Sequence, residues 1–540
     1  MFPIRAGKTL VPIGSILIRS AQELPEQLAV KKGEVEYSYK ELDQVSSEIA
    51  SGLLKRGLRT GDRIGLIGEN SPHWCLAYFS IMKAGMTAVP IDPSLPTGDV
   101  YHIVSESGAK VVFADDQWFD EIKELGKVRI VNLNTIEELR QKDTNLPSVP
   151  LDSLAVLIYT SGTTGFSKGV MLTHKNIITN VDSIYRSIEY DENDNFLGLL
   201  PLHHTFAATC GFLSAIYNRA RIYFPQSLKS RDIATALEDY RITVLLVVPL
   251  ILEKFCDALK RKIRKSGIHK RLMLGLCSGL ARLIPKTRGF LFRSVRKRMG
   301  MKHIRYIISG GAALPRTISR TLELLNLPII QGYGLTEASP VLTINPPERP
   351  RNDSVGIPIP GVEISIRDPD DDGVGEIIAR GENIMLGYYK NEEATREVLK
   401  DNWLHTGDLG YIDDGYLHII GRKKYIIVTP GGKNVYPEVI EERLLQSDYI
   451  KEALVIPECR EGKEEVVAIL YPDFERLDED FMDLTPEKVE EIIKNEIIKY
   501  GRSLPEYCRL RRFTIREEEF PKTTTRKIKR QLFIKKGVEI

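Results

Sequence analysis

Residues 154–169 read Leu-Ala-Val-Leu-Ile-Tyr-Thr-Ser-Gly-Thr-Thr-Gly-Phe-Ser-Lys-Gly, an apolar run followed by a loop of small and hydroxyl-bearing residues. The run is typical of a strand buried in a parallel sheet. In the loop, small residues let backbone N–H groups approach an anion closely, and Lys168 adds a positive charge. Because the spacing is not that of a Walker A loop, two interpretations stay open, an unusual phosphate-binding loop and a Ser/Thr/Gly-rich surface loop.

Apolar runs of the same kind recur at residues 63–68, 88–91, 110–114 and 244–248, and helical patterns lie between them. This alternation predicts an α/β fold with mostly parallel sheets covered by helices. From about residue 355 the strands become short and are separated by Gly and Asp clusters. We therefore predict a small antiparallel or barrel-like subdomain over residues 355–422, and a domain boundary near Arg422.

The composition is that of an ordinary globular protein, with 42% hydrophobic and 27% charged residues and a formal net charge of +2. The six cysteines form no C-x-x-C pair, which favours reduced thiols in a cytoplasmic protein. The apolar run from Leu10 to Ile18 is broken by Pro12 and Gly14 and is too short to span a bilayer. We expect a cytoplasmic protein without a membrane-spanning segment.

Four further motifs follow in order along the chain. They are Ser-Gly-Gly-Ala-Ala at 309–313, Gln-Gly-Tyr-Gly-Leu-Thr-Glu at 331–337, Trp-Leu-His-Thr-Gly-Asp at 403–408 and Pro-Lys-Thr-Thr-Thr-Arg-Lys-Ile-Lys-Arg at 521–530. A glycine pair after a strand allows a flat ligand to lie on the backbone, and a carboxylate beside a hydroxyl suits Mg²⁺. Taken singly, each motif also fits a structural role: a tight turn, a helix N-terminal carboxylate, a turn aspartate, and a solvated basic tail that includes Lys522, Lys529 and Arg530.

Together with the loop at 159–169, these motifs resemble those of the adenylate-forming superfamily, which includes acyl-CoA synthetases, firefly luciferase and the adenylation domains of peptide synthetases. Residues 38–42, 61–63 and 84–85 match early segments of the same family, so the resemblance covers nearly the whole chain. It implies a large N-terminal domain (1–422) with two mostly parallel sheets, and a small mobile α+β domain (423–540) with its hinge at Lys424. It also implies ATP, Mg²⁺ and CoA as cofactor and co-substrates.

The resemblance assigns roles to individual residues. Tyr333 would stack on adenine, Thr336 would contact the α-phosphate and Asp408 would bind the ribose hydroxyls. Mg²⁺ is expected at Glu337 and Thr160, and the pantetheine path at Gly431 and Gly432. The full set implied for ATP or AMP binding is Thr160, Ser161, Gly162, Thr163, Thr164, Gly165, Lys168, Gly310, Gly311, Ala312, Gly332, Tyr333, Gly334, Thr336, Asp408 and Arg422.

Two further residues are the candidates for catalysis. Lys527 aligns with the family's catalytic lysine, although Arg526 stands where the family usually has Gly. A lysine is useful because a carboxylate must attack the α-phosphorus of ATP and both reactants are anionic. His204, in Leu-Pro-Leu-His-His-Thr-Phe at 200–206, aligns with the residue that faces the acyl carboxylate; a partly buried structural histidine is the alternative. Tyr425 stands where the family commonly has Asp.

The segment from Lys260 to Lys302 contains 15 Lys and Arg residues, no Asp or Glu, and interleaved apolar residues such as Leu283, Phe290 and Phe292. Such a stretch indicates binding to an anionic membrane surface. Nucleic acid and a solvated helix pair are the alternatives, and no nucleic acid is expected because the adenylation motifs are complete. Long-chain acyl-CoA synthetases carry an extra segment at this place, which implies peripheral contact with the inner face of the membrane.

The substrate implied by the resemblance is a medium- or long-chain fatty acid, joined to CoA. An amino acid is disfavoured because no Asp stands where amino-acid-activating domains hold the substrate ammonium, and no carrier domain follows Lys527 in this sequence. Two alternatives stay open: an acyl–acyl-carrier-protein synthetase, and a ligase for aryl or other carboxylates. A non-catalytic membrane-binding scaffold is disfavoured, because Lys527, Glu337 and Asp408 are all present.

Overall fold

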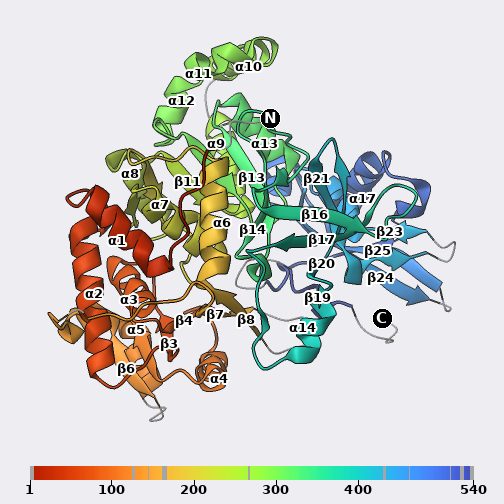
Figure 1. Cartoon of the computed structure of the whole chain (residues 1–540). Helices are drawn as coiled ribbons and strands as arrows, with labels where there is room; N and C mark the ends of the chain where they lie inside the picture. The colour runs from red at the N-terminus through yellow and green to blue at the C-terminus, as the bar shows by residue number, and fades with distance from the viewer. Residues whose placement is uncertain are drawn as a thin grey trace. The chain divides into compact units, whose positions relative to one another are not determined.

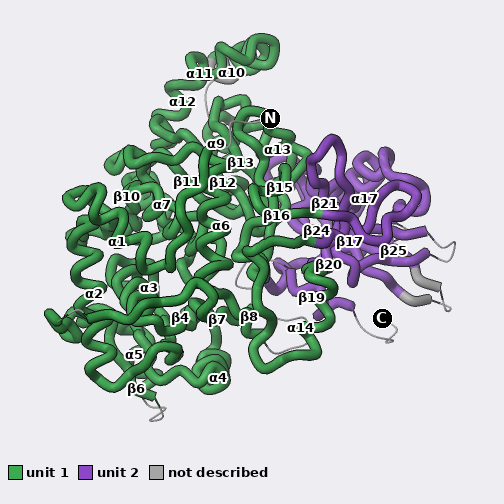
Figure 2. The backbone as a smooth tube through the Cα atoms, in the orientation of Figure 1, with its two compact units in different colours: residues 1–364, 379–405 green, residues 365–378, 406–540 purple. Residues whose placement is uncertain are grey.

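The computed structural model describes residues 5–123, 128–143, 145–160, 167–264, 268–429, 433–460, 463–510, 512–522 and 528–534, and its elements are labelled in Figure 1. The chain forms two compact units, Met1–Ile364 with Ala379–His405, and Ser365–Ile378 with Thr406–Ile540 (Figure 2). The predicted α/β class is confirmed, whereas the division into a fixed part (1–422) and a mobile part (423–540) stays a prediction. Among the described residues, no helix is long and apolar enough to cross a membrane.

A nine-stranded sheet forms one half of the first unit. All neighbouring strands from β13 to β1 are parallel, and antiparallel strands occur only towards the two edges. The order is β15 (Ile357–Pro358), β14 (Val341–Ile344), β13 (Ile329–Gly334), β12 (Tyr306–Ser309), β11 (Val244–Val247), β9 (Asn195–Leu197), β10 (Arg221–Tyr223), β1 (Leu28–Lys32) and β2 (Val35–Ser38).

A seven-stranded sheet forms the other half. Strands β7, β4, β3, β5 and β6 are parallel, and the chain then turns back after β7, so that β8 and β18 add antiparallel strands at one edge. The order is β18 (Gly387–Tyr388), β8 (Lys168–Thr173), β7 (Leu154–Thr160), β4 (Thr87–Ile91), β3 (Arg63–Ile67), β5 (Val111–Ala114) and β6 (Arg129–Asn132).

Helices fill the space between these sheets and cover their outer faces. Buried residues of α1, α2, α3 and α6 share one core with strands of both sheets, and α3 is buried along nearly its whole length. Helices α4 and α5 pack on the far face of the seven-stranded sheet, and α8, α9 and α13 pack on the far face of the nine-stranded sheet. The inner helices are α1 (Ile13–Glu23), α2 (Tyr39–Lys55), α3 (Pro72–Lys83), α6 (His174–Ser187) and α7 (Ser214–Tyr217).

The remaining helices of the first unit lie outside the two sheets or in the connections. They are α4 (Thr97–Ser107), α5 (Asp116–Lys123), α8 (Ser230–Asp239), α9 (Pro249–Arg264), α10 (Ile268–Leu283), α11 (Arg288–Leu291), α12 (Arg293–Arg298), α13 (Arg316–Leu324) and α14 (Glu392–Val398).

Helix α6 begins with a reciprocal cap that the local sequence specifies. The Thr173 hydroxyl accepts a hydrogen bond from the Asn176 backbone N–H, and the Asn176 side chain accepts one from the Thr173 N–H, at 3.0 and 2.9 Å. Two backbone donors that have no partner within the helix are thereby satisfied. The helix therefore starts directly after β8, and its buried face carries Asn176 and Asn180 into the core.

The second unit has a core of its own, built on the antiparallel pair β24 and β25, with β26 parallel to β25. Helices α15 and α17 cover this sheet. A five-stranded sheet in the order β16, β17, β20, β19, with β21 beside β20, agrees with the predicted run of short strands after residue 355. The bounds are β16 (Val362–Arg367), β17 (Gly375–Gly381), β19 (Leu399–Lys400), β20 (Trp403–Asp413), β21 (Tyr416–Arg422), β22 (Ile427–Val428), β23 (Asn434–Val435), α15 (Pro437–Leu444), β24 (Ile450–Arg460), β25 (Lys463–Pro472), α16 (Phe474–Asp480), α17 (Pro486–Gly501) and β26 (Arg512–Ile515).

Candidate active site

The predicted phosphate loop is only partly within the described residues, because Ser161, Gly162, Thr163, Thr164 and Gly165 lie outside them. Its two ends are placed. Thr160 ends β7 and Lys168 begins β8, and the two residues face each other across this antiparallel pair. The Thr160 hydroxyl donates to the Lys168 carbonyl at 3.5 Å. The two ends of the loop are therefore held together by the pairing of β7 with β8, which the sequence did not indicate.

Tyr388 connects this loop to the predicted Mg²⁺ ligand. Its hydroxyl donates to Oε1 of Glu337 at 2.7 Å, and the ammonium group of Lys168 lies 5.1 Å from the centre of its ring. Burial and the Glu337 carboxylate raise the pKa of Tyr388 far above its usual value, so its hydroxyl stays a donor. A carboxylate held in this way is a suitable hard-oxygen ligand for Mg²⁺.

Asparagine side chains of α6 hold the turn that carries Glu337. The Asn180 amide donates to the carbonyl of Val341 at 2.8 Å, and the amide of Asn383 donates to the carbonyl of Ala338 at 2.8 Å. The Asn176 amide donates to the carbonyls of Glu382 and Ile384 at 2.7 and 2.8 Å. All three asparagines are buried. The turn after β13 is thus bonded to the same helix as the segment that leads to Tyr388.

The predicted adenine-binding segments lie at the carboxyl ends of the neighbouring strands β12 and β13. A side chain at Gly334 would place its Cβ 1.8 Å from the Pro340 carbonyl oxygen, and one at Gly310 would come within 3.1 Å of the Phe206 ring. Gly311 has φ +81°, a conformation that side chains rarely adopt. Ala312, Gly332, Tyr333 and Thr336 lie in the same two segments, so the chain brings the predicted residues together at one edge of the sheet.

Two buried polar atoms at this edge point to a ligand. Ser309 and Gln331 are register partners on β12 and β13, with 3% and 7% of their surface exposed. Within the described part of the chain, the Ser309 hydroxyl and the Gln331 amide nitrogen have no hydrogen-bond partner. Buried polar groups are normally paired with protein, water or ligand. Both residues begin motifs that the sequence indicated, at 309–313 and 331–337, but neither was assigned a role there.

The His204 segment reaches the predicted α-phosphate position. The hydroxyls of Thr205 and Thr336 are 3.5 Å apart, although 131 residues separate them in sequence. Just beyond, residues Phe206–Leu213 form a π-helix (η2), a rare conformation found often at functional sites. The segment that carries the expected acid-binding histidine therefore contacts Thr336, the residue expected to contact the α-phosphate.

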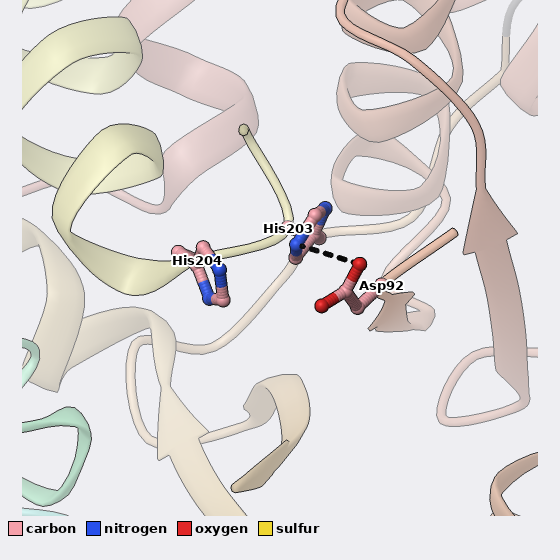
Figure 3. Close-up of side chains that lie close together, drawn as sticks. All are labelled: Asp92, His203 and His204. Atoms are coloured by element: carbon pink, nitrogen blue, oxygen red, sulfur yellow. Dashed lines mark ion pairs between the residues drawn. The ribbon is translucent and has the colours of Figure 1, made fainter. Parts of the chain in front are cut away.

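Asp92, His203 and His204 form a cluster in which one potential ligand atom of each lies within 4.8 Å of the others (Figure 3). Asp92 directly follows β4 of the seven-stranded sheet, whereas the histidines follow β9 of the nine-stranded sheet. Burial lowers the pKa of His203 to about 3 and also lowers the pKa of His204. Burial by itself would raise the pKa of Asp92, but His203 and hydrogen bonds from Ser94 bring it below its usual value.

The second unit contains the predicted ribose-binding residues. Asp408 and Arg422 are register partners on β20 and β21, and the guanidinium Nε lies 2.8 Å from the Asp408 carboxylate. This carboxylate is 8% exposed. The pair is therefore positioned by strand register, and ribose binding by it stays a prediction. Gly431, Gly432 and Lys527 lie outside the described residues.

The predicted hinge residue Lys424 contacts the unusual Tyr425. Its ammonium group lies 4.7 Å from the Tyr425 ring, and the Arg530 guanidinium lies 4.9 Å from the same ring. Burial and the nearby Arg422 lower the pKa of Lys424 to about 8. Tyr425 thus replaces a carboxylate by a ring that attracts cations through its face.

The expectation of a solvated basic tail is wrong for two of its residues. Arg530 binds both oxygens of the Glu441 carboxylate at 2.8 and 2.7 Å and donates to the Val455 carbonyl. Lys522 forms ion pairs with Glu452 and Glu519. Lys529 is exposed, as expected. The segments on both sides of Lys527 are therefore bound to the second unit.

The family model described as "AMP-binding enzyme" matches residues 17–389 of this chain. A feruloyl-CoA synthase from Amycolatopsis sp is 28% identical over 480 residues, which cover 87% of this chain and 90% of that protein. The human long-chain-fatty-acid–CoA ligase 1 is 29% identical over 496 residues, which cover 82% of this chain and 70% of that protein.

Solved structures share the fold over the full length. The o-succinylbenzoate CoA synthetase from Bacillus subtilis, in complex with its acyl-adenylate intermediate, superposes with a TM-score of 0.78 at 22% identity, covering 98% of this chain and 99% of that one. MatB from Rhodopseudomonas palustris with bound ATP gives a TM-score of 0.78 at 24% identity, covering 97% and 98%. At these identities the likeness establishes the fold.

Replacing Tyr388 by Phe removes the hydroxyl that orients Glu337, and we expect ATP to bind about tenfold more weakly in the presence of Mg²⁺, since one hydrogen bond to a charged group is lost. Isothermal titration of ATP with and without Mg²⁺ measures this. Tyr389→Phe is the matched control, because Tyr389 is the adjacent tyrosine and the described residues include no hydrogen-bond partner of its hydroxyl. Equal ATP affinity in both variants would contradict the role given to Tyr388.

Proposed function

Because this chain belongs to the AMP-binding enzyme family, and so to the adenylate-forming superfamily, we propose that it is an AMP-forming ligase that joins a medium- or long-chain fatty acid to CoA. The relatives named above support an acid–thiol ligase, one of them acting on a fatty acid and another on an aryl acid according to their names. In the proposed reaction ATP first converts the acid to acyl-AMP. CoA then takes the acyl group.

The observation that carries this proposal is the contact between Thr205 and Thr336. It brings the segment of His204, proposed to face the carboxylate, next to the residue proposed to hold the α-phosphate. A carboxylate oxygen then attacks the α-phosphorus, the bond to the β-phosphate bridging oxygen breaks, and pyrophosphate leaves. The thiol sulfur of CoA attacks the acyl carbon of the mixed anhydride, AMP leaves, and the thiol proton is released.

The chain's own groups would stabilise the charge that these steps bring together. Lys168 is proposed to contact the departing pyrophosphate, and Lys527 to bridge the carboxylate and the α-phosphate. Glu337 and Thr160 fit the role of Mg²⁺ ligands, because both offer hard oxygens and Tyr388 engages one oxygen of Glu337. When bound, Mg²⁺ would neutralise phosphate charge. Asp408 and Arg422 are proposed to bind the ribose.

The two steps are proposed to need different faces of a mobile domain, residues 423–540, which turns about Lys424. In the second step Gly431 and Gly432 would line the path of pantetheine. Lys424 and Arg530 both contact the ring of Tyr425, which follows the hinge residue directly. This ring therefore links the hinge to the segment just after Lys527. A domain that carries both the catalytic lysine and the thioester-forming face can present only one of them to the bound substrate at a time.

A small apolar cavity lies near the His204 segment, and we take its apolar lining as consistent with the proposed fatty acid. Its volume is about 20 Å³, and its lining is formed by Phe196, Leu197, Gly198, Leu199, Leu200, Leu202, Ala207, Gly211, Phe212, Ile222, Phe224 and Leu246. The lining includes residues two positions before and three positions after His204, and it contains no charged side chain.

We expect pyrophosphate release from ATP to depend on a medium- or long-chain fatty acid, with acyl-CoA formed when CoA is present. A panel of fatty, aryl and amino acids, each assayed with CoA, with a carrier protein and without a thiol, measures this. If the kcat/KM for ferulate-type aryl acids is higher than that for every fatty acid, the substrate is an aryl acid and the proposed fatty acid is wrong. If a thioester forms with the carrier protein but not with CoA, the acceptor is a carrier protein. If no acid causes release of pyrophosphate, the chain is a non-catalytic membrane-binding scaffold.

Lys527→Ala is expected to reduce acyl-AMP formation by at least about a hundredfold, as expected when a group that stabilises transition-state charge is removed. Thioester formation from supplied acyl-AMP should change little, because the second step uses the other face of the mobile domain. Single-turnover assays of the two half-reactions measure this, with the exposed neighbour Lys529→Ala as control. Equal loss in both half-reactions would remove Lys527 from its assigned role.

Helices α10, α11 and α12 are proposed to bind an anionic membrane surface, and Figure 1 shows them projecting from the rest of the first unit. Leu276, Leu280 and Leu283 are 76%, 42% and 82% exposed and share one face of α10. On an adjacent face Ala281 is fully buried in the core. Phe290 is 83% exposed, whereas Phe292 is buried, so Phe292 is not available for lipid.

The basic residues of this segment also divide into two groups. Arg288 pairs with Glu323 at 2.7 Å, and Arg296 donates to the carbonyl of Gly289 at 3.0 Å, so both hold the helices together. Arg293, Lys297 and Arg298 are exposed and have no ion-pair partner in the described part of the chain. Exposed cations around exposed leucines and a phenylalanine are the pattern of a helix that lies on anionic lipid.

Charge reversal of Arg293, Lys297 and Arg298 to Glu is expected to weaken binding to vesicles of anionic phospholipid by at least tenfold, at roughly 1 kcal/mol for each charge removed and more for reversal. Vesicle co-sedimentation measures this, with zwitterionic vesicles for comparison. Reversal of the exposed Lys123 and Lys142, which lie elsewhere in the first unit, is the control. Unchanged co-sedimentation of the triple variant would exclude these helices as the lipid contact.

A further inference from the structure

A buried imidazole nitrogen near the proposed acid-binding site has no hydrogen-bond partner. Nε2 of His203 is in this position among the described residues, and only 7% of the His203 surface is exposed. The nearest carboxylate oxygen, Oδ1 of Asp92, is 3.5 Å away, beyond the usual length of a hydrogen bond. A buried polar atom without a partner costs roughly 1–3 kcal/mol, so its retention needs a reason.

The position of this nitrogen is fixed by bonds from both sheets. The Asn70 side chain, which follows β3, donates to the carbonyls of Gly198 and Leu200 and accepts from the Leu202 N–H at 2.9 Å. The segment that leads to His203 is therefore held against the seven-stranded sheet. Asp92 is fixed as well, since its Oδ1 accepts from the backbone and the hydroxyl of Ser94 at 2.8 and 2.7 Å.

His204 completes the cluster, and Figure 3 shows the Asp92 carboxylate facing both histidines. The two imidazole rings are 4.3 Å apart between centroids and tilted by 58°. In a tetrahedral site with metal–ligand bonds of about 2.0–2.2 Å, ligand atoms lie roughly 3.4 Å apart. The Asp92–His203 separation already has this value, and the potential ligand atoms of all three residues lie within 4.8 Å of one another.

We propose that Asp92, His203 and His204 form a binding site for a divalent transition-metal ion such as Zn²⁺. Two imidazole nitrogens and one carboxylate oxygen are ligands that Zn²⁺ prefers, and three protein ligands leave a fourth position open. The site is distinct from the Mg²⁺ position at Glu337, because Mg²⁺ prefers an all-oxygen shell. The hydrogen bonds from Ser94 to Asp92 serve as the outer support that metal-binding carboxylates usually have.

Occupation of this site inhibits acid activation, a consequence that rests on the proposed function. A bound metal ion holds His204 away from the substrate carboxylate. Zn²⁺ therefore raises the apparent KM for the acid, leaves kcat at saturating acid unchanged, and is reversed by a chelator. Mg²⁺ at the same concentration has no such effect.

The test of the site uses the full chain without ATP or acid, so that its outcome does not depend on the proposed function. After treatment with a chelator, the protein is titrated with Co²⁺, which reports its ligands by visible absorption. We expect one equivalent with d–d bands, no sulfur-to-cobalt charge-transfer band, and displacement by Zn²⁺. His203→Asn and Asp92→Asn are each expected to weaken Co²⁺ binding by at least about tenfold.

His102→Asn is the matched control. His102 pairs with Glu106 at 3.2 Å on an exposed face of α4, where a surface histidine and carboxylate could bind metal weakly. This variant should bind Co²⁺ with the same affinity as the unaltered protein. Co²⁺ binding unchanged in His203→Asn and Asp92→Asn, or lost in His102→Asn, would overturn the proposal.

X-ray absorption on the Zn²⁺-loaded unaltered protein gives an answer that does not depend on how the variants fold. Two imidazole ligands with nitrogen and oxygen neighbours only would support the site. A sulfur neighbour would assign the bound metal to cysteine and overturn it. If the chain forms no acyl-AMP with any acid, the proposed function is wrong. The metal-binding result does not depend on that outcome.

Discussion

The buried amide of Asn180 is the contact on which the arrangement of the candidate site most depends. It is fully buried on α6 and donates to the Val341 carbonyl, while its oxygen accepts from the Val341 N–H. Asn383, also buried, donates to the carbonyls of Ala338 and Val341. Loss of the Asn180 side chain would remove the acceptor of the buried Val341 N–H, at roughly 1–3 kcal/mol. The turn of Glu337 and the strand of Tyr388 are therefore held by one helix between two sheets.

This arrangement explains how residues far apart in sequence come to serve one reaction. Strands of the nine-stranded sheet bring Thr336 and the His204 segment to one edge, and strands of the seven-stranded sheet bring Lys168 and Asp92. Ligands of open α/β sheets bind at the carboxyl ends of strands. Two sheets joined by buried helices provide two such edges, and residues proposed to contact ATP, Thr336 and Lys168, lie on both. The proposed chemistry needs both substrates at adjacent positions.

Much of this could be predicted from the sequence, because strands that are buried on both faces and glycine-rich turns leave clear local patterns. The parallel strands at 63–67 and 244–247 are examples. Contacts between distant segments leave no such pattern. Tyr388, Asp92 and His203 become candidates for the site only when the chain is folded. Arg530 was expected to be solvated because its partners, Glu441 and Val455, are remote in sequence. The signals that existed were weak: a Tyr-Tyr pair at 388–389, and a second histidine beside His204.

Transfer of ¹⁸O from a labelled acid tests the central claim most directly. The acid, labelled in both carboxylate oxygens, is converted in the presence of ATP and CoA, and the AMP is analysed by mass spectrometry. If the carboxylate attacks the α-phosphorus, one ¹⁸O atom remains on AMP after the thioester forms. Unlabelled AMP, or label found in released phosphate, would contradict an acyl-adenylate intermediate and with it the function assigned to this fold.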